Sequence, residues 1–258
     1  MFCLSVQKIQ TKPLGGLASQ FKLAPALRKQ YSEAVIQSKT PRKAAVLALF
    51  YPDVNQHTKF LLTERASYNG THSSQISFPG GKIDKTDKNL KKAALRETFE
   101  EVGIIESSIN VIRELTDVYI PPSNFLATPF IGFVDKRPVF DLNYEVDKAI
   151  EVLISDLLND SNITSINMTT SYMDNANVPC FKLNDYIVWG ATAMILSEIK
   201  ELLKMGSLSL EDLLERSDTD ECLGRMKVLA VLESLPRLGK VKARRTMEEI
   251  GISESRRL

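Results

Sequence analysis

Hydrophobic residues in the first two thirds of the chain occur in short runs separated by turn residues. Apolar runs of about four to eight residues, bounded by Gly, Pro, Asn or Asp, indicate buried strands. The pattern predicts strands at residues 44–51, 60–63, 111–116, 130–134 and 151–154. This part of the chain is therefore expected to contain a sheet.

Two longer stretches have the periodicity of helices. One follows a glycine loop at residues 80–81 and ends near Gly103, a residue type that suits a helix C-terminus. The other is amphipathic and runs from about residue 190 to residue 205. Beyond Gly206 the chain shows helical periodicity and loop breaks but no strand pattern. We therefore expect an N-terminal arm at 1–35, a mixed domain at 36–205 and a small all-α domain at 207–258.

The composition is that of a globular protein and indicates no particular partner. The chain has 258 residues, of which 43% are hydrophobic and 25% charged, and this balance excludes the disordered and fibrous classes. The net charge is only +1. Cys3, Cys180 and Cys222 are far apart and odd in number, so we expect neither a disulfide framework nor a zinc site. No apolar run approaches the roughly 18 residues of a membrane span, and we expect a cytoplasmic protein.

The N-terminal residues have an unusual charge pattern. Residues 1–32 contain no Asp or Glu and five Lys or Arg, which is typical of an organellar transit peptide. Ser and Arg are only weakly enriched, and we favour an N-terminal arm over a transit peptide.

Three glutamates share one face of the first predicted helix. Glu97, Glu100 and Glu101 are spaced i, i+3 and i+4, and like charges at this spacing repel by about 0.2 to 0.5 kcal/mol per pair. A hard cation such as Mg²⁺ would offset that repulsion, because it takes oxygen ligands shared between carboxylates and phosphates. Arg96 is placed to pair with Glu100 at i+4. The alternative is a solvated acidic helix face. The core-facing stripe of this helix is expected to contain Leu95, Thr98, Phe99 and Val102.

The acidic helix also belongs to a recognisable motif. Gly81, then Asp87, then Arg-Glu-Thr-Phe-Glu-Glu-Val-Gly-Ile at residues 96–104 resembles the Nudix box, a Gly, a spacer, an acid, a second spacer and Arg-Glu-x-x-Glu-Glu-x-Gly. The box has one additional residue before Arg96 and an Asp where most members have Glu.

The residues before the box narrow the resemblance to one branch of that family. Residues 61–66 and 75–81 resemble the coenzyme A diphosphatase branch, and the similarity covers about residues 20–205. The chain departs from the branch at Gly70, where Arg is usual, and at Ser74, where Gly is usual. Both departures concern the substrate more than the hydrolysis.

The resemblance implies a fold, a reaction and a set of site residues. The fold is an α/β (α+β) Nudix fold with a mixed sheet between helices, and the reaction is metal-dependent cleavage of a pyrophosphate linkage with Mg²⁺ or Mn²⁺. Implied metal ligands are Glu97, Glu101 and Glu100, and implied catalytic residues are Glu100, Glu97 and Arg96. Implied substrate-binding residues are Arg65, Gly80 and Gly81. Glu145 is an additional candidate ligand, and a surface glutamate is an equal alternative.

Coenzyme A or a related nucleoside diphosphate derivative is the substrate that this branch implies. Two alternatives remain open: a Nudix-like domain that senses a nucleotide within a DNA-binding regulator, and a house-cleaning enzyme that acts on other nucleotides.

The C-terminal part has a basic character of its own. Residues 235–258 contain seven basic and three acidic side chains, a net charge of +4. Residues 226–257 resemble the actinobacterial integration host factor, a small helical DNA-binding family, from which Arg237 departs because a Gly often stands there. The resemblance implies nonspecific DNA contacts, with free backbone N–H groups at residues 235–239 facing a phosphate. The expected nucleic-acid-binding residues are Lys240, Lys242, Arg244 and Arg245. The alternative is a helical cap with a solvated basic face.

Overall fold

The computed structural model describes residues 9–10, 12–66, 75–170 and 173–206, and in the C-terminal part residues 228–229, 232, 239–249, 251–253 and 255–256. The chain divides into two compact units, Met1–Gly206 and Ser207–Leu258. Each unit has its own cluster of buried apolar side chains.

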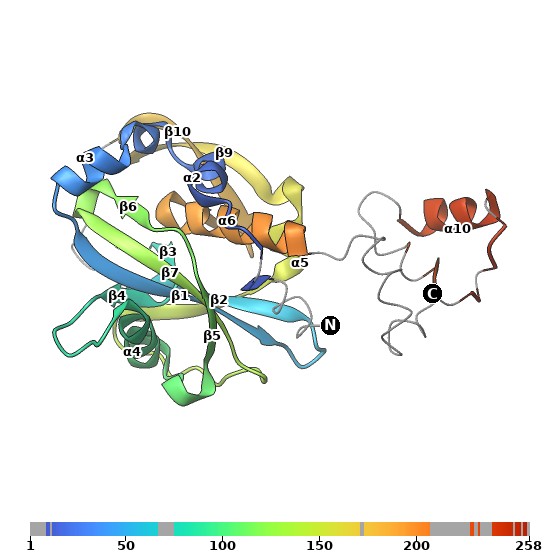
Figure 1. Ribbon diagram of the computed structural model, residues 1–258, viewed down its shortest axis with the longest axis horizontal. Coiled ribbons are helices and arrows are strands. Elements are labelled where there is room, and N and C mark those ends of the chain that lie inside the picture. The colour runs from blue at the N-terminus through green and yellow to red at the C-terminus, as the bar shows by residue number, and fades with distance from the viewer. Residues whose placement is uncertain are drawn as a thin grey trace. The chain divides into compact units, whose positions relative to one another are not determined.

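The first unit is built on an eight-stranded mixed sheet (Figure 1). The central strand β1 pairs in parallel with β7 and antiparallel with β2 and β4, while β3 and β8 pair with β2, and β5 and β6 pair with β7. The strands are β1 (Arg42–Pro52), β2 (Thr58–Arg65), β3 (Ile76–Ser77), β4 (Gly80–Lys82), β5 (Asn110–Glu114), β6 (Val118–Ile120), β7 (Phe125–Phe133) and β8 (Val146–Leu153). All five strands predicted from the sequence are confirmed, with shifted ends.

The sheet lies between two helices, α4 (Leu90–Val102) and α6 (Gly190–Gly206) (Figure 1). Successive side chains of a strand point to opposite faces, so β1 must be apolar on both. Leu47 and Leu49 pack in the cluster that contains the buried residues of α4, whereas Ala48 and Phe50 pack in the cluster that contains those of α6. This arrangement confirms the predicted mixed sheet sandwiched between helices.

A second sheet of three strands was not predicted. β9 (Ile163–Thr170), β10 (Met173–Leu183) and β11 (Tyr186–Trp189) form an antiparallel sheet in the order β11-β10-β9. The sequence of β9 is mostly Thr, Ser and Asn, and Thr164, Ser165 and Asn167 are exposed. A strand without a continuous apolar run gives no hydrophobic signal, so the pattern missed it.

Several short helical segments complete the first unit. They are α2 (Gly16–Gln20), α3 (Glu33–Ser38), α5 (Ile154–Leu158) and the 3₁₀ segments η1 (Phe21–Leu23), η2 (Ala26–Gln30), η3 (Glu106–Ser108), η4 (Pro121–Ser123) and η5 (Asp160–Asn162). Among the described residues, no helix is both long and apolar enough to span a membrane.

The N-terminal residues differ from the arm that the sequence suggested. Leu23 and Ala24 belong to the same buried cluster as the apolar face of α6. The carboxylate of Glu198 in α6 is fully buried and accepts hydrogen bonds from the Gly16 amide (3.1 Å), the Gln20 side-chain amide (3.0 Å) and the Thr116 hydroxyl (2.7 Å). The described part of residues 9–35 is therefore packed into the first unit, because its apolar and amide side chains find partners on α6.

The second unit contains α10 (Gly239–Glu249) in the part that the structure describes. Ala243 and Met247, one helical turn apart, are buried with Leu232 in a small apolar cluster. The helical character predicted beyond Gly206 is confirmed for these residues. The predicted turn at 235–239 lies outside the described residues except for Gly239, where α10 begins.

The buried Glu198 gives a test of how the N-terminal segment contributes to stability. Glu198→Ala removes one acceptor from three donors, and we expect the free energy of unfolding to fall by about 3 kcal/mol. Urea denaturation followed by fluorescence measures this, because the single tryptophan, Trp189, belongs to the first unit. Glu201→Ala is the control, since Glu201 makes a partly exposed ion pair with Lys22 and should cost less than about 1 kcal/mol. Equal losses for the two variants would contradict this account.

Candidate active site

Helix α4 carries the acidic residues of the site and has a defined beginning and end. The Asn89 side chain accepts a hydrogen bond from the Lys92 amide at 3.0 Å and caps the N-terminus. Gly103 ends the helix with a positive φ of 74° and donates its amide to the Phe99 carbonyl at 2.9 Å. The predicted role of Gly103 as the C-terminal glycine is confirmed.

The buried face of α4 is turned toward Glu101. Leu95, Thr98 and Val102 are buried as predicted, but Phe99 is 52% exposed, so its assignment to the core-facing stripe was wrong. Glu101 is only 5% exposed. The face that the sheet covers is centred nearer to Thr98 and Glu101 than to Leu95, which leaves Phe99 at its edge.

Glu101 is held by the backbone of β4. The Gly80 amide donates a hydrogen bond to Oε2 of Glu101 at 3.1 Å. Burial, helped by the charges of Glu97 and Glu145, raises the pKa of Glu101 to about 7, although the Gly80 amide and Arg65 oppose the rise. A carboxyl group with this pKa changes its charge near neutral pH.

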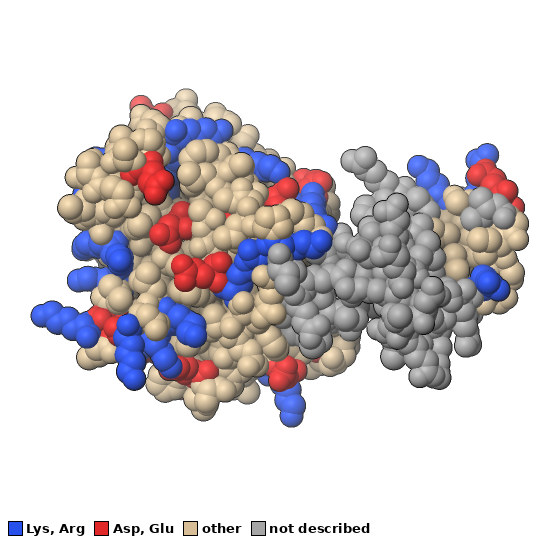
Figure 2. Space-filling model, in the orientation of Figure 1, with Lys and Arg blue, Asp and Glu red and all other residues tan. Residues whose placement is uncertain are grey.

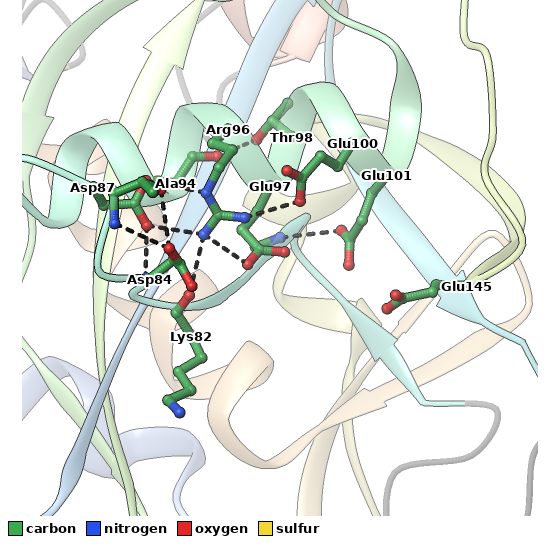
Figure 3. A network of polar contacts seen from close by, with 12 residues as sticks. Lys82, Asp84, Asp87, Ala94, Arg96, Glu97, Thr98, Glu100, Glu101 and Glu145 are labelled. Atoms are coloured by element: carbon green, nitrogen blue, oxygen red, sulfur yellow. Dashed lines mark hydrogen bonds and ion pairs between the residues drawn. The ribbon is translucent and has the colours of Figure 1, made fainter.

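Arg96 links four groups around the site (Figure 3). Its guanidinium lies 3.0 Å from the Glu97 carboxylate and 2.8 Å from that of Glu100, which confirms the predicted i, i+4 pair. It also donates to both oxygens of Asp87, at 3.0 and 2.9 Å, and to the Lys82 carbonyl at 3.2 Å. These contacts fix the positions of two of the three box glutamates.

Asp87 has a role that the sequence reasoning missed. It stands at the acid position of the box, and its hydrogen bonds to Arg96 hold its pKa below the ordinary value. Its side chain is almost fully buried. The position of an acid in the motif was the available signal, but its partner Arg96 lies nine positions further along the chain, within α4, and no periodic spacing links the two residues.

Two glycines allow the backbone to approach the carboxylates. A Cβ added at Gly81 would lie 2.4 Å from the carboxyl carbon of Glu97. Gly80 has a φ of 149°, and a Cβ there would lie 2.3 Å from the Ala45 carbonyl oxygen. A larger residue would therefore collide with Glu97 at position 81 and with the backbone of β1 at position 80.

Arg65 and Glu145 form the other side of the site. The Arg65 guanidinium lies 3.2 Å from the Glu145 carboxylate, and its Nε is buried with no hydrogen-bond partner among the described residues. Figure 3 shows the Glu145 side chain pointing toward Glu101, and the Glu145 charge contributes to the raised pKa of Glu101. Glu145 is thus placed beside the box glutamates.

The gathered oxygens have the donor chemistry of a site for a hard cation. Four carboxylates lie near one another, and in the described part of the chain they pair with two guanidinium groups, those of Arg65 and Arg96. The four belong to Glu97, Glu100, Glu101 and Glu145. Within the described ranges, no three metal-binding side chains converge on one point as they stand. Arg96 pairs with Glu97 and Glu100, and Arg65 pairs with Glu145. A metal cation would therefore have to compete with the two arginines for these three carboxylates.

A cavity of about 380 Å³ lies elsewhere in this unit, between the N-terminal segment and β5, β6 and α6. None of the predicted site residues lines it. The carboxylate cluster is therefore separate from this cavity.

The raised pKa of Glu101 predicts a pH-dependent stability. The pKa of Glu101 is about 7 in the folded chain, above the ordinary value of 4.5. Protonated Glu101 therefore stabilises the fold fully below pH 4.5, and this contribution is lost as pH rises through 7. Relative to Glu101→Gln, the wild-type chain should lose about 3 kcal/mol of unfolding free energy between pH 4.5 and pH 7.5. Urea denaturation in a chelating buffer measures the difference. Glu100→Gln controls for removal of one negative charge from the same helix, and an equal trend in that variant would rule out burial as the cause.

Comparisons with known proteins agree with this geometry. The NUDIX domain model matches residues 41–150, and the S13-like H2TH domain model matches residues 203–258. The chain is 26% identical over 196 residues to the peroxisomal coenzyme A diphosphatase ndx-8 of Caenorhabditis elegans, covering 72% of this chain and 82% of that protein. It is 34% identical over 192 residues to the uncharacterized Nudix hydrolase NudL of Enterobacter sp. (strain 638), covering 72% and 92%. The chain belongs to the Nudix hydrolase family.

Proposed function

We propose that this chain cleaves the diphosphate linkage of coenzyme A, or of a related nucleoside diphosphate derivative, with a divalent cation, Mg²⁺ or Mn²⁺, bound at α4. The observation that carries the proposal is the buried Glu101 carboxyl, hydrogen-bonded to the Gly80 amide among Glu97 and Glu145. The similarity to ndx-8, whose name gives coenzyme A as its substrate, supports the choice of substrate.

Glu97 and Glu101 would hold the cation, with Glu100 or Glu145 as a further ligand. When bound, the cation would neutralise charge on the diphosphate and lower the pKa of a coordinated water. The all-oxygen donor set suits either ion.

The positions of these carboxylates depend on groups that would not themselves bind the ion. Arg96 fixes Glu97 and Glu100, and Asp87 fixes Arg96. The Gly80 amide fixes Glu101. Such positioning lowers the cost of organising the site when substrate binds.

Arg65 and the glycine strand would contact the substrate. The Arg65 side chain is 33% exposed, so its guanidinium group could donate to a phosphate oxygen. The absence of a side chain at Gly81 lets the Glu97 carboxyl lie directly against β4, so a diphosphate held near Glu97 would also lie near the backbone of this strand.

Glu100 is the best placed of the box glutamates to reach water, because its side chain is 48% exposed. In the proposed reaction Glu100 orients a water molecule, and the Glu100 carboxylate accepts a proton from this water as its oxygen attacks phosphorus. The P–O–P bond breaks, and the two products are phosphate monoesters. From coenzyme A these are phosphopantetheine and adenosine bisphosphate.

Replacing either the buried Glu101 or the exposed Glu100 should abolish most of this activity. We expect Glu101→Gln and Glu100→Gln each to lower kcat by at least about 100-fold with Mg²⁺ or Mn²⁺. Chromatographic measurement of phosphopantetheine released from coenzyme A gives the rate. Glu114→Gln, which removes an exposed carboxylate from β5, should leave the rate within twofold of wild type. A Glu101→Gln variant as active as wild type would overturn the proposed site.

A substrate panel separates this function from its alternatives. NADH, ADP-ribose and nucleoside triphosphates should be cleaved less efficiently than coenzyme A. Faster cleavage of one of them would indicate a house-cleaning enzyme, and binding without cleavage would indicate a nucleotide-sensing regulator.

We also propose that the second unit binds DNA without sequence preference. Lys242, Arg244 and Arg245 are exposed on α10, away from the buried Ala243 and Met247. Lys240 lies in the first turn of the same helix, and Arg245 pairs with Glu249 at 3.1 Å. Exposed cations on one helix suit phosphate contacts, and the match to an S13-like H2TH domain supports a nucleic-acid partner.

A gel-shift titration with nonspecific duplex DNA tests the second unit. Lys242→Ala/Arg244→Ala should weaken binding at every DNA sequence and make the slope of log affinity against log salt shallower by about two. The chain shortened to residues 1–206 should not bind. Lys29→Ala/Lys136→Ala removes the same charge from the first unit and is the control. Unchanged DNA binding by the α10 variant would contradict this proposal and favour the alternative, a helical cap whose basic face is only solvated.

A further inference from the structure

The cavity between the N-terminal segment and the sheet is lined by both buried and exposed residues. Its buried lining residues include Gln20, Leu115 and Met194, and its exposed ones include Glu33 and Asp117, so it opens to solvent. Its volume of about 380 Å³ lies within the range of about 300 to 1,000 Å³ that is usual for pockets that hold small organic molecules. A small molecule could therefore enter the cavity while the N-terminal segment stays packed.

Gln20 brings to this cavity a hydrogen-bond acceptor that has no partner. Its side-chain nitrogen donates to the Thr116 carbonyl at 2.8 Å and to the Glu198 carboxylate at 3.0 Å. Because both partners are acceptors, the nitrogen and oxygen of this amide cannot be exchanged. The oxygen, Oε1, is buried and has no hydrogen-bond partner in the described part of the chain. A ligand group that reaches Oε1 must therefore be a hydrogen-bond donor.

The charged side chains around the cavity favour a cation. Its described lining contains three acidic residues and one basic residue, namely Glu33, Glu114, Asp117 and Arg28. The Arg28 guanidinium donates to the Tyr119 carbonyl at 2.5 Å. Figure 2 shows acidic side chains on the face where Figure 1 labels α2 and β6. Three carboxylates against one guanidinium repel an anion, so a phosphate-bearing ligand does not suit this cavity.

Aromatic rings supply the surface that an organic cation needs. Phe21, Tyr31 and Tyr119 line the cavity, and the rings of the two tyrosines pack edge to face with their centroids 5.4 Å apart. The face of an aromatic ring attracts an ammonium group that lies within about 6 Å of its centroid. Leu126 and Met194 add aliphatic surface. The lining thus suits a molecule with an apolar body and a positively charged nitrogen.

We infer that this cavity binds a small organic amine, whose ammonium group donates to Oε1 of Gln20 and whose apolar body packs against the aromatic lining. The inference does not depend on the proposed function, because none of the box glutamates lines the cavity. The N-terminal segment forms one side of the cavity, so a bound amine stabilises the packing of this segment on β6 and α6.

The test compares three ligands of similar shape on the full-length chain, by isothermal titration calorimetry at neutral pH. Phenethylamine is a cation, 2-phenylethanol is a neutral hydrogen-bond donor and 3-phenylpropionate is an anion. Phenethylamine should bind at least about tenfold more tightly than 2-phenylethanol, and 3-phenylpropionate should not bind detectably. Hydrogen exchange locates the site: bound phenethylamine should slow exchange in residues 16–37 and 114–119 and leave α4 unchanged.

Two variants test the contacts within the cavity. Gln20→Met removes the acceptor and should weaken phenethylamine binding at least about tenfold. Glu33→Gln removes one exposed carboxylate and should weaken it about threefold. Asp147→Asn is the matched control, because it removes the same charge from β8, outside the cavity, and should leave the affinity unchanged. Gln20→Met also deprives Glu198 of a donor, so if that variant does not fold, Glu33→Gln and the three ligands decide the outcome.

Four results would overturn the inference. Equal affinities for phenethylamine and 2-phenylethanol would mean that the cavity does not select charge, and equal losses in Glu33→Gln and Asp147→Asn would mean that the overall charge of the chain attracts the amine. Binding of none of the three ligands would leave water as the partner of Gln20. Displacement of phenethylamine by coenzyme A in a chelating buffer would make the cavity part of the substrate site. Cleavage of coenzyme A is measured separately, so the proposed function can fail or hold independently of these results.

Discussion

The burial of one carboxyl group, that of Glu101, is the constraint on which the site depends. Burial of a charged group without partners is costly, and the Gly80 amide supplies one hydrogen bond in compensation. That bond requires β4 to lie directly against α4, and only glycine at residues 80 and 81 permits such an approach. The same requirement turns the helix so that Phe99 is exposed to solvent. The burial of a charged residue, Glu101, and the exposure of an apolar one, Phe99, therefore both follow from the close approach of β4 to α4.

Repulsion among the acids is offset in two different ways. Arg96 is shared by Glu97, Glu100 and Asp87, so a single cation organises three carboxylates. Glu101 has no such contact, and desolvation raises its pKa instead. A hard cation between them would favour the charged form of all these groups. The site thus combines a half whose carboxylates are held by Arg96 with a half, around Glu101, whose charge depends on what binds.

The sequence predicted the central elements because their signals are local. Strands β1 and β2 have apolar runs, and α4 carries its acids at helical spacing and ends at Gly103. Contacts between distant residues left no such signal. The bond of Asp87 to Arg96 depends on a turn, and that of Gly16 to Glu198 joins residues 182 positions apart. The polar strand β9 was missed because its partner, not its own composition, makes it a strand.

The packing of the N-terminal segment on α6 has a consequence for the solubility of shortened chains. Leu23 and Ala24 pack in the buried cluster that contains the apolar face of α6, and without this segment Glu198 would lose two of its three donors. A chain beginning at residue 36 would expose a contiguous apolar surface to water. Surfaces of this kind associate with one another, so the shortened protein would aggregate even with every residue of the carboxylate cluster in place.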